Sequence, residues 1–202
     1  MNFNKPQYKK MDTEQLVILA QENDYKAIEE LVKREQKNIF ATFSYLNLKT
    51  DNVYDLTQEA LLHMTKGLHN LKNPKTFKSW LNQIIMHLFY DDLRKISRKP
   101  LVLSLDNESN NNEESQVSNP QNYIHDKKCK PMEMCLSHEL DNMIKTEMRA
   151  LPEHFRVPIV LRELQGLTYD EIAHITNTNV GTVKSRISRA RIKLQDKLKN
   201  YI

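Results

Sequence analysis

The stretch Leu167–Leu194, LTYDEIAHITNTNVGTVKSRISRARIKL, decides the fold of this chain. Thr168 and Glu171 match the Thr-x-x-Glu capping box, in which each side chain bonds the backbone N–H of the other residue and so opens a helix. The helix that follows is short and stops near Asn177, a residue type that tolerates the left-handed backbone of a tight turn. Asn179 can cap the next helix. The stretch therefore predicts two helices joined by a sharp turn.

The second of these helices is expected to have one apolar and one basic side. Its apolar residues recur at helical spacing and form one stripe: Val183, Ile187, Ala190, Leu194 and Leu198. Five basic residues precede the first acidic one, Asp196: Lys184, Arg186, Arg189, Arg191 and Lys193. A short helix, a turn and a basic helix make a helix-turn-helix, whose second helix enters the DNA major groove. A solvated amphipathic helix is the alternative, and the coincidence of cap, turn and charge argues against it.

Helical geometry also predicts which side chains face the DNA. Turning about 100° per residue away from the apolar stripe leaves a groove-facing set: Lys184, Ser185, Ser188 and Arg189. Lys184 and Arg189 can pair with guanine N7 and O6. Arg186 and Arg191 lie toward the flanks and are expected to contact phosphates. Thr182 is small and stands at the N-terminal end of the helix, where it permits close approach to DNA.

The composition excludes several other classes of protein. Only three glycines occur, so the chain has neither a phosphate-binding loop nor a dinucleotide fingerprint. Its two cysteines are too few for a disulfide framework. The mean hydropathy is −0.67, and no apolar run approaches the ~18 residues of a membrane span. Because no apolar stretch follows the basic N-terminus, we expect no cleaved signal peptide and a soluble intracellular protein.

The rest of the chain predicts an all-α protein with two small helical domains. Apolar residues recur at helical spacing after four positions that suit a helix start: Asp12 or Thr13, Asp24, Asp51 and Pro74. The polar, Asn/Ser-rich stretch 99–131 cannot bury enough apolar surface to offset chain entropy, so it is interpreted as a flexible linker. We therefore predict a domain over 1–98, a linker over 99–131, and a domain over 132–202 that contains the helix-turn-helix.

Three segments resemble extracytoplasmic-function (ECF) sigma factors, the small two-domain class of sigma factors. The most specific is LPEHFRVPIVLRELQGLTYDEIAHITNTNVGTVKSRISRARIKL (151–194), which resembles the fourth domain of sigma factors. NVYDLTQEALL (52–62) looks like the family's polymerase-clamp-binding helix, and FKSWLNQIIMHLFYDDLRK (77–95) looks like its promoter-melting helix. The chain departs from the family at 176–179, where Thr178 puts a hydroxyl in place of an apolar residue.

Two features of the segment 77–95 qualify its resemblance to a melting helix. Gln83 and His87 stand where the family frequently has Arg and Asn, so the resemblance carries over the positions of these two DNA contacts but not the side chains. Phe77, Trp80 and Phe89 could stack on bases. Their helical spacing with aliphatic residues instead predicts that they belong to the core.

The resemblance implies an alternative sigma factor that binds core RNA polymerase and directs it to promoters in a bacterial cytoplasm. It assigns the minus-thirty-five element to Thr182, Lys184, Ser185, Arg186, Ser188, Arg189 and Arg191. It assigns recognition and melting of the minus-ten element to Asn73, Lys75, Thr76, Gln83, His87, Arg94, Lys95 and Arg98. Polymerase binding falls to Asp55, Gln58 and Glu59. An anti-sigma factor is a common partner in this family.

Other classes of protein fit the sequence less well. A response-regulator-type transcription factor shares the C-terminal helix-turn-helix, but the N-terminal half lacks the strand–helix alternation of a receiver domain. A DNA-cleaving enzyme needs a nucleophile or converging carboxylates, and the adjacent Asp91 and Asp92 on one helix do not converge. The set His125, Cys129, Cys135 and His138 has loose spacing for zinc. We therefore expect no catalytic residue, no metal and no cofactor.

Overall fold

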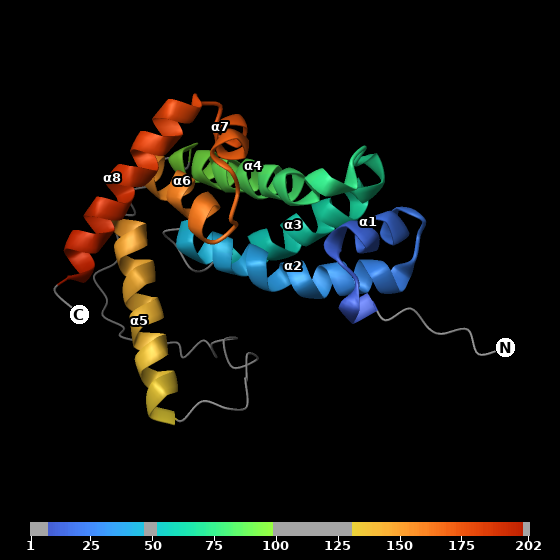
Figure 1. Ribbon diagram of the computed structural model, residues 1–202, viewed down its shortest axis with the longest axis horizontal. Helices are drawn as coiled ribbons and strands as arrows, with labels where there is room; N and C mark the ends of the chain where they lie inside the picture. The colour runs from blue at the N-terminus through green and yellow to red at the C-terminus, as the bar shows by residue number, and fades with distance from the viewer. Residues whose placement is uncertain (1–7, 47–51, 99–130, 200–202) are drawn as a thin grey trace, which may run out of the picture.

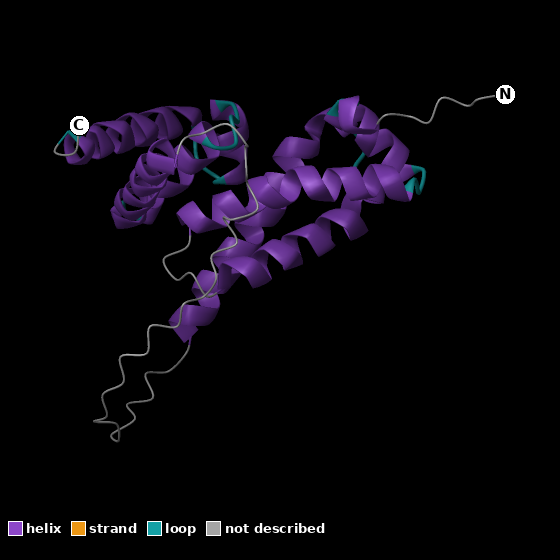
Figure 2. Ribbon diagram, turned by 90° about the horizontal axis from the view of Figure 1, so that it is seen from below, coloured by secondary structure: helices purple, strands orange, loops and turns teal. Residues whose placement is uncertain are grey.

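A computed structural model describes residues 8–46, 52–98 and 131–199, and all regular structure within these ranges is helical (Figure 2). This confirms the all-α fold class predicted from the sequence. The stretch 99–130, which makes up nearly all of the predicted linker, lies outside the described residues. The helices fall into two regions, one before and one after that stretch (Figure 1).

Within its described residues, the first region contains the α-helices α1 (Thr13–Gln21), α2 (Tyr25–Leu46), α3 (Val53–Gly67) and α4 (Phe77–Arg98). Short 3-10 turns accompany them among the described residues, including η1 (Tyr8–Lys10), η3 (Leu68–Asn70) and η4 (Pro74–Thr76). Helix α2 packs against α1, α3 and α4, and α3 packs against α4 (Figure 1). The long helices thus form a bundle whose apolar stripes face one another.

Side-chain caps begin the first two helices where the sequence predicts. The Asp12 carboxylate accepts the Gln15 backbone N–H at 2.7 Å, and the Gln15 side chain returns a bond to the Asp12 N–H. Asp24 Oδ1 accepts the Lys26 N–H at 2.9 Å. Pro74 begins the 3-10 turn η4, whereas the predicted α-helix starts three residues later at Phe77. The reason is that the Thr76 N–H bonds the Asn73 carbonyl, a three-residue rather than a four-residue spacing.

The aromatic residues of α4 lie in the core, as predicted. Phe77 and Phe89 are buried, and Trp80 is half-buried with its ring centroid 6.0 Å from that of Phe77. Gly67 allows this packing, because a Cβ atom at that position would lie 2.9 Å from the Trp80 ring. The junction of α3 and η3 is therefore fitted to the indole of α4.

The second region contains α5 (Pro131–Ala150), α6 (Glu153–Glu163), α7 (Tyr169–Ile175) and α8 (Val180–Leu198). Helix α8 packs against α5, α6 and α7. Arg156, only 3% exposed, joins α5 to α6 by donating to the carbonyls of Arg149 at 2.7 Å and Leu151 at 3.3 Å. The arginine of the LPEHFR segment is therefore structural, since it bonds carbonyls at the end of a helix that lack intrahelical partners.

The two regions contact each other through α2 with α5 and α6, and through α4 with α7 (Figure 1). Gln165, which is buried, bonds across this boundary to the Thr42 hydroxyl of α2. The amide of Gln83 on α4 lies 3.3 Å from Nδ1 of His174 on α7. Among the described residues, no helix is long and apolar enough to cross a membrane.

Candidate nucleic-acid interface

The predicted helix-turn-helix consists of α7, a turn and α8, and its local signals are confirmed. Thr168 Oγ1 accepts the Glu171 N–H at 3.2 Å, and the Glu171 carboxylate accepts the Thr168 N–H at 2.8 Å. Asn177 adopts the left-handed backbone with φ of 49°. The Asn179 side chain accepts the Thr182 N–H at 2.7 Å and caps α8. These bonds fix the angle at which α8 leaves the turn.

The turn accommodates Thr178, where the resembled family usually has an apolar residue. The Thr178 hydroxyl lies 2.9 Å from the Thr176 hydroxyl, which itself donates to the Ile172 carbonyl at 2.7 Å. Both hydroxyls are therefore hydrogen-bonded within the turn, so the polar atom of Thr178 is not left unsatisfied in a half-buried position.

Helix α8 separates its apolar and polar sides as predicted. Val183, Ile187 and Ala190 are buried, and Leu194 and Leu198 are half-buried farther along the same stripe. The side chains on the opposite face are exposed: Lys184, Ser185, Ser188 and Arg189. Because the stripe is held against α6 and α7, this exposed face is turned outward and can reach a DNA groove.

Other residues predicted to contact the minus-thirty-five element make contacts within the protein. The Arg191 guanidinium donates to Glu163 Oε1 at 2.6 and 3.1 Å, and this bond holds the pKa of Arg191 above its ordinary value. Thr182 is half-buried, and its carbonyl accepts the Ser185 hydroxyl at 2.9 Å. Lys184 Nζ lies 5.8 Å from the Tyr169 ring centroid, within range of a cation–π contact.

Arg186 is less exposed than Arg189 and Arg191, the other arginines of α8. It is half-buried, and its charge acts on Tyr90 of α4 in the first region. Burial raises the pKa of the Tyr90 hydroxyl, the charge of Glu153 raises it further, and the charge of Arg186 opposes both. The charge of Arg186 therefore acts across the boundary between the two regions.

The residues predicted for the minus-ten element lie at the N-cap of η4, on η4 and along α4. Asn73, Lys75 and Thr76 are exposed, and Asn73 caps the 3-10 turn by accepting the Lys75 N–H at 3.1 Å. Gln83, His87, Arg94 and Lys95 are exposed along α4. Arg98 ends the helix, and its side chain lies outside the described residues.

The carboxylate of Asp91 lies on α4 beside two of the predicted minus-ten residues, His87 and Arg94. His87 Nδ1 lies 3.0 Å from Asp91 Oδ2, and the Arg94 guanidinium bonds the other oxygen of Asp91. Asp91 therefore lowers the positive potential that a phosphate backbone meets on α4. The neighbouring Asp92 is buried and accepts a bond from Asn52 at 3.1 Å, so the two carboxylates do not converge.

The face of α3 predicted to bind polymerase is exposed. Asp55, Gln58 and Glu59 all project to solvent. Two apolar side chains on this helix are also exposed, Tyr54 at 40% and Leu62 at 51%. Tyr54 and Leu62 stand four residues on either side of Gln58, so all three share one face. The sequence interpretation missed them, although the apolar pair at 61–62 signalled that one leucine must face outward.

No cluster of three or more potential metal ligands occurs among the described residues. The loosely spaced zinc set lies outside them, because His125 and Cys129 are not described, nor are the side chains of Cys135 and His138.

Comparisons with known families match both regions. The model of sigma-70 region 2 matches residues 31–99, and the model of sigma-70 region 4 matches residues 141–194. The ECF RNA polymerase sigma-E factor of Escherichia coli (strain K12) is 33% identical over 192 residues, which cover 93% of this chain and 94% of that protein. The sigma-E factor of Haemophilus influenzae is 31% identical over 183 residues, covering 91% and 93%.

Solved structures of similar proteins show the same fold. The sigma factor RpoE of Bartonella quintana, in complex with the anti-sigma factor NepR, matches with a TM-score of 0.60 and 28% identity, covering 87% of this chain and 97% of that one. CnrH in complex with the cytosolic domain of CnrY also matches with a TM-score of 0.60, covering 93% and 97%. At 19% identity, this second match indicates a shared fold.

Proposed function

Because this chain belongs to the ECF sigma factors of the sigma-70 family, we propose that its two helical regions divide promoter recognition between them. It is an alternative sigma factor that binds core RNA polymerase and directs promoter-specific transcription initiation. The observation that supports this division is the exposed face of α8 bearing Lys184, Ser185, Ser188 and Arg189 beside a buried apolar stripe.

In this proposal the region 132–202 reads the minus-thirty-five element. Lys184 and Arg189 meet base edges, and Arg191 meets phosphate after exchanging its bond with Glu163. The region 1–98 recognises and melts the minus-ten element with the exposed residues of η4 and α4. Unstacked bases need a pocket and a single strand needs basic surface; Lys75 and Lys95 supply exposed charge for this purpose. The stretch 99–131 connects the two regions.

The exposed face of α3 is proposed to bind core polymerase through Asp55, Gln58 and Glu59. Charged groups at such a surface govern specificity and the rate of encounter. Tyr54 and Leu62 add apolar area that polymerase would bury. We further propose an anti-sigma factor as a partner, because the similar RpoE was solved with one. The protein would act in the bacterial cytoplasm as an initiation factor without catalysis of its own.

Reversal of the two acidic charges on α3 tests this proposal. Asp55→Lys/Glu59→Lys should prevent co-purification with bacterial core polymerase and abolish transcription in vitro from a promoter library, while helicity stays unchanged. Glu22→Lys/Glu29→Lys makes the same change of charge at the C-cap of α1 and on α2, and should retain polymerase binding. Unaltered polymerase binding by the α3 double variant would remove the assignment of this face.

A further inference from the structure

Tyr169 is the one phenylalanine, tyrosine or tryptophan within the helix-turn-helix sequence 167–194. It is the first residue of α7, directly after the Thr168 cap, and its half-buried side chain packs against the core. The guanidinium carbon of Arg162 on α6 lies over this ring, 4.8 Å from its centroid, and Arg162 also donates to the Leu167 carbonyl at 2.7 Å. The cap, the core and Arg162 therefore hold the ring in place.

The ring of Tyr169 also contacts the recognition helix, α8. Lys184 Nζ lies 5.8 Å from the ring centroid, within the distance at which the negative face of an aromatic ring attracts an ammonium group. Lys184 is exposed, and its side chain makes no ion pair or hydrogen bond among the described residues. The ring is therefore the group that restrains the Lys184 ammonium in the free chain.

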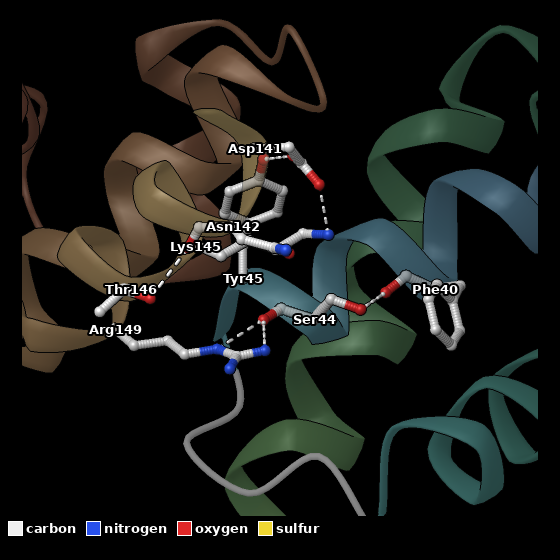
Figure 3. A network of polar contacts seen from close by, with 8 residues as sticks. All are labelled: Phe40, Ser44, Tyr45, Asp141, Asn142, Lys145, Thr146 and Arg149. Carbon is white, nitrogen blue, oxygen red and sulfur yellow. Dashed lines mark hydrogen bonds and ion pairs between the residues drawn. The ribbon is translucent and has the colours of Figure 1, made fainter. Parts of the chain in front are cut away.

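A second lysine over a tyrosine ring is held differently. Lys145 Nζ lies 5.7 Å from the centroid of the Tyr45 ring and 2.6 Å from Asp141 Oδ2 (Figure 3). Its side chain is only 14% exposed, so its charge is compensated within the protein. Lys184 has the ring but no carboxylate partner among the described residues, so its charge remains available to a partner outside the protein.

Lys184 can keep its contact with the ring while it binds a base. An ammonium group carries three N–H donors, and the donors that point away from the ring remain free for guanine N7 and O6. Lysine is among the side chains that lose the most rotamer freedom when they are ordered. Because the ring already restrains Lys184 in the free chain, part of this cost is removed from DNA binding.

The hydroxyl of Tyr169 acts on a different residue of α8. Glu163 is the main cause of the raised pKa of Arg191, and the Tyr169 hydroxyl adds to this rise as a further hydrogen-bond partner. Arg191 is proposed to contact phosphate, whereas Lys184 is proposed to contact a base. The ring and the hydroxyl of Tyr169 therefore act on different kinds of DNA contact, and substitutions can separate them.

We propose that Tyr169 is a positioning residue for base readout, whose ring holds the Lys184 ammonium where it can meet the base edges of the minus-thirty-five element. Tyr169 acts through Lys184 and not by a DNA contact of its own. This role rests on the proposed function, because the position of Lys184 affects specificity only if Lys184 reads a base. It places a determinant of promoter specificity in α7, outside the recognition helix.

Binding of the polymerase holoenzyme to promoter duplexes tests this role. The readout is discrimination, the ratio of the dissociation constants for a duplex altered at one minus-thirty-five base pair and for the original duplex. The base pair chosen is the one at which Lys184→Ala lowers discrimination most. Tyr169→Leu should lower discrimination there about two- to fivefold, the range of a cation–π contact at an exposed site. Tyr169→Leu/Lys184→Ala should discriminate as well as Lys184→Ala alone, because the ring then has no ammonium to hold.

Two further variants separate the ring from a general effect on the fold. Tyr169→Phe keeps the ring and should retain full discrimination, while the loss of the hydroxyl weakens binding to all duplexes alike through Arg191. Phe155→Leu is the matched control, because Phe155 is also half-buried and lies under a lysine of α8, with Lys193 Nζ 5.9 Å from its ring centroid. Lys193 is outside the groove-facing set, so Phe155→Leu should leave discrimination unchanged.

Three results would overturn the positioning role. Unchanged discrimination in Tyr169→Leu would mean that the ring does not contribute to base readout. Increased discrimination would mean that the ring competes with guanine for the ammonium. An equal loss in the Lys184→Ala background would mean that Tyr169 acts on DNA binding without Lys184.

Nuclear magnetic resonance of the unaltered full chain keeps the test decisive if Tyr169→Leu does not fold. The Cε protons of Lys184 should be shifted upfield from those of Lys197, which has no ring contact among the described residues, because an aromatic ring shields protons above its face. Lys184→Ala identifies the resonance. The absence of an upfield shift would overturn the contact and with it the positioning role.

Failure of the proposed function gives a different result. If Lys184→Ala leaves discrimination unchanged at every base pair, Lys184 does not read bases, so that part of the proposed function is wrong and the positioning role falls with it. If Lys184→Ala lowers discrimination but Tyr169→Leu does not, the proposed readout stands and only the positioning role is withdrawn.

Discussion

Helices α4 and α8 are both proposed to meet DNA, yet they present their polar side chains differently. On α8, Lys184 and Arg189 stand exposed beside the exposed serines Ser185 and Ser188. On α4, His87 pairs with Asp91, and Gln83 contacts α7 of the other region. Apart from the contact of Lys184 with Tyr169, the groove-facing side of α8 is therefore formed in the free chain, whereas the surface of α4 must first exchange contacts within the protein.

This difference governs how substitutions on the two helices are interpreted. A change on the groove-facing side of α8 removes a DNA contact and, at Lys184, the cation–π contact with Tyr169, so its effect on binding is nearly direct. A change on α4 also alters an ion pair or the contact with α7, so its effect combines DNA binding with the arrangement of the two regions. The sharpest experiments accordingly begin on α8.

The largest effect is expected from the two groove-facing basic residues of α8. Lys184→Ala and Arg189→Ala should each change the preference for particular minus-thirty-five bases by about 1–3 kcal/mol, because each side chain can pair with guanine N7 and O6. The measurement is binding of the polymerase holoenzyme to single-base promoter variants. If both substitutions weaken every variant equally, base readout by this face is wrong and the two residues contact phosphates.

Arg191 provides the matched control on the same helix. Because it lies toward the flank and pairs with Glu163, Arg191→Ala should weaken all promoter variants alike and lower the salt slope of binding by about one unit. A base-specific effect of Arg191→Ala would show that Arg191 faces the bases and that the groove-facing side of α8 has been assigned to the wrong residues.

Local signals account for what the sequence predicted correctly. The caps at Asp12, Thr168 and Asn179 each depend on residues within three positions of one another. The left-handed turn at Asn177 likewise depends on one residue type. Such short-range rules need no knowledge of the fold, which is why the helix-turn-helix could be placed before the structure was known.

A smaller effect is expected from that turn. Asn177→Ala should destabilise the fold by about 1 kcal/mol, because alanine tolerates a positive φ less well than asparagine. Asn23, between α1 and α2, has φ of 66° and offers the same change in the first region. Both substitutions should lower the free energy of unfolding measured with urea, but only Asn177→Ala should also weaken minus-thirty-five binding. Equal losses of that binding would mean that the two regions do not act separately.

Contacts between distant residues account for what the sequence could not predict. Tyr45 and Asp141 are separated by 96 positions, and neither stands in a motif. Arg149 lies at the end of α5, where a basic residue alone indicates only a favourable interaction with its own helix dipole. That it donates to the Ser44 carbonyl of α2 instead depends on how the regions pack, which no periodicity encodes. By contrast, helical spacing alone could have predicted that Asp91 pairs with His87 and Arg94, because these residues lie four positions before it and three positions after it.

The smallest effect is expected from Asp91 on α4. Asp91→Asn should strengthen binding of the holoenzyme to minus-ten DNA up to about fivefold at low salt. A fivefold gain in affinity corresponds to about 1 kcal/mol, which is the upper end of what an exposed ion pair contributes. The neutral amide frees His87 and Arg94 for phosphates and removes a like-charge repulsion against the DNA backbone. The gain should shrink as salt rises, because the charges are exposed and screened.

Asp196→Asn on α8 is the control for this last change. Asp196 is an exposed carboxylate paired with Lys199 near the C-terminal end of α8. It follows the groove-facing residues by two helical turns, so its removal should leave DNA binding unchanged. A gain at Asp91 without one at Asp196 would show that α4, unlike α8, carries a carboxylate within its own DNA surface. No gain at either position would mean that DNA does not approach α4 along the side of Asp91, and the proposed contacts of His87 and Arg94 would have to be withdrawn.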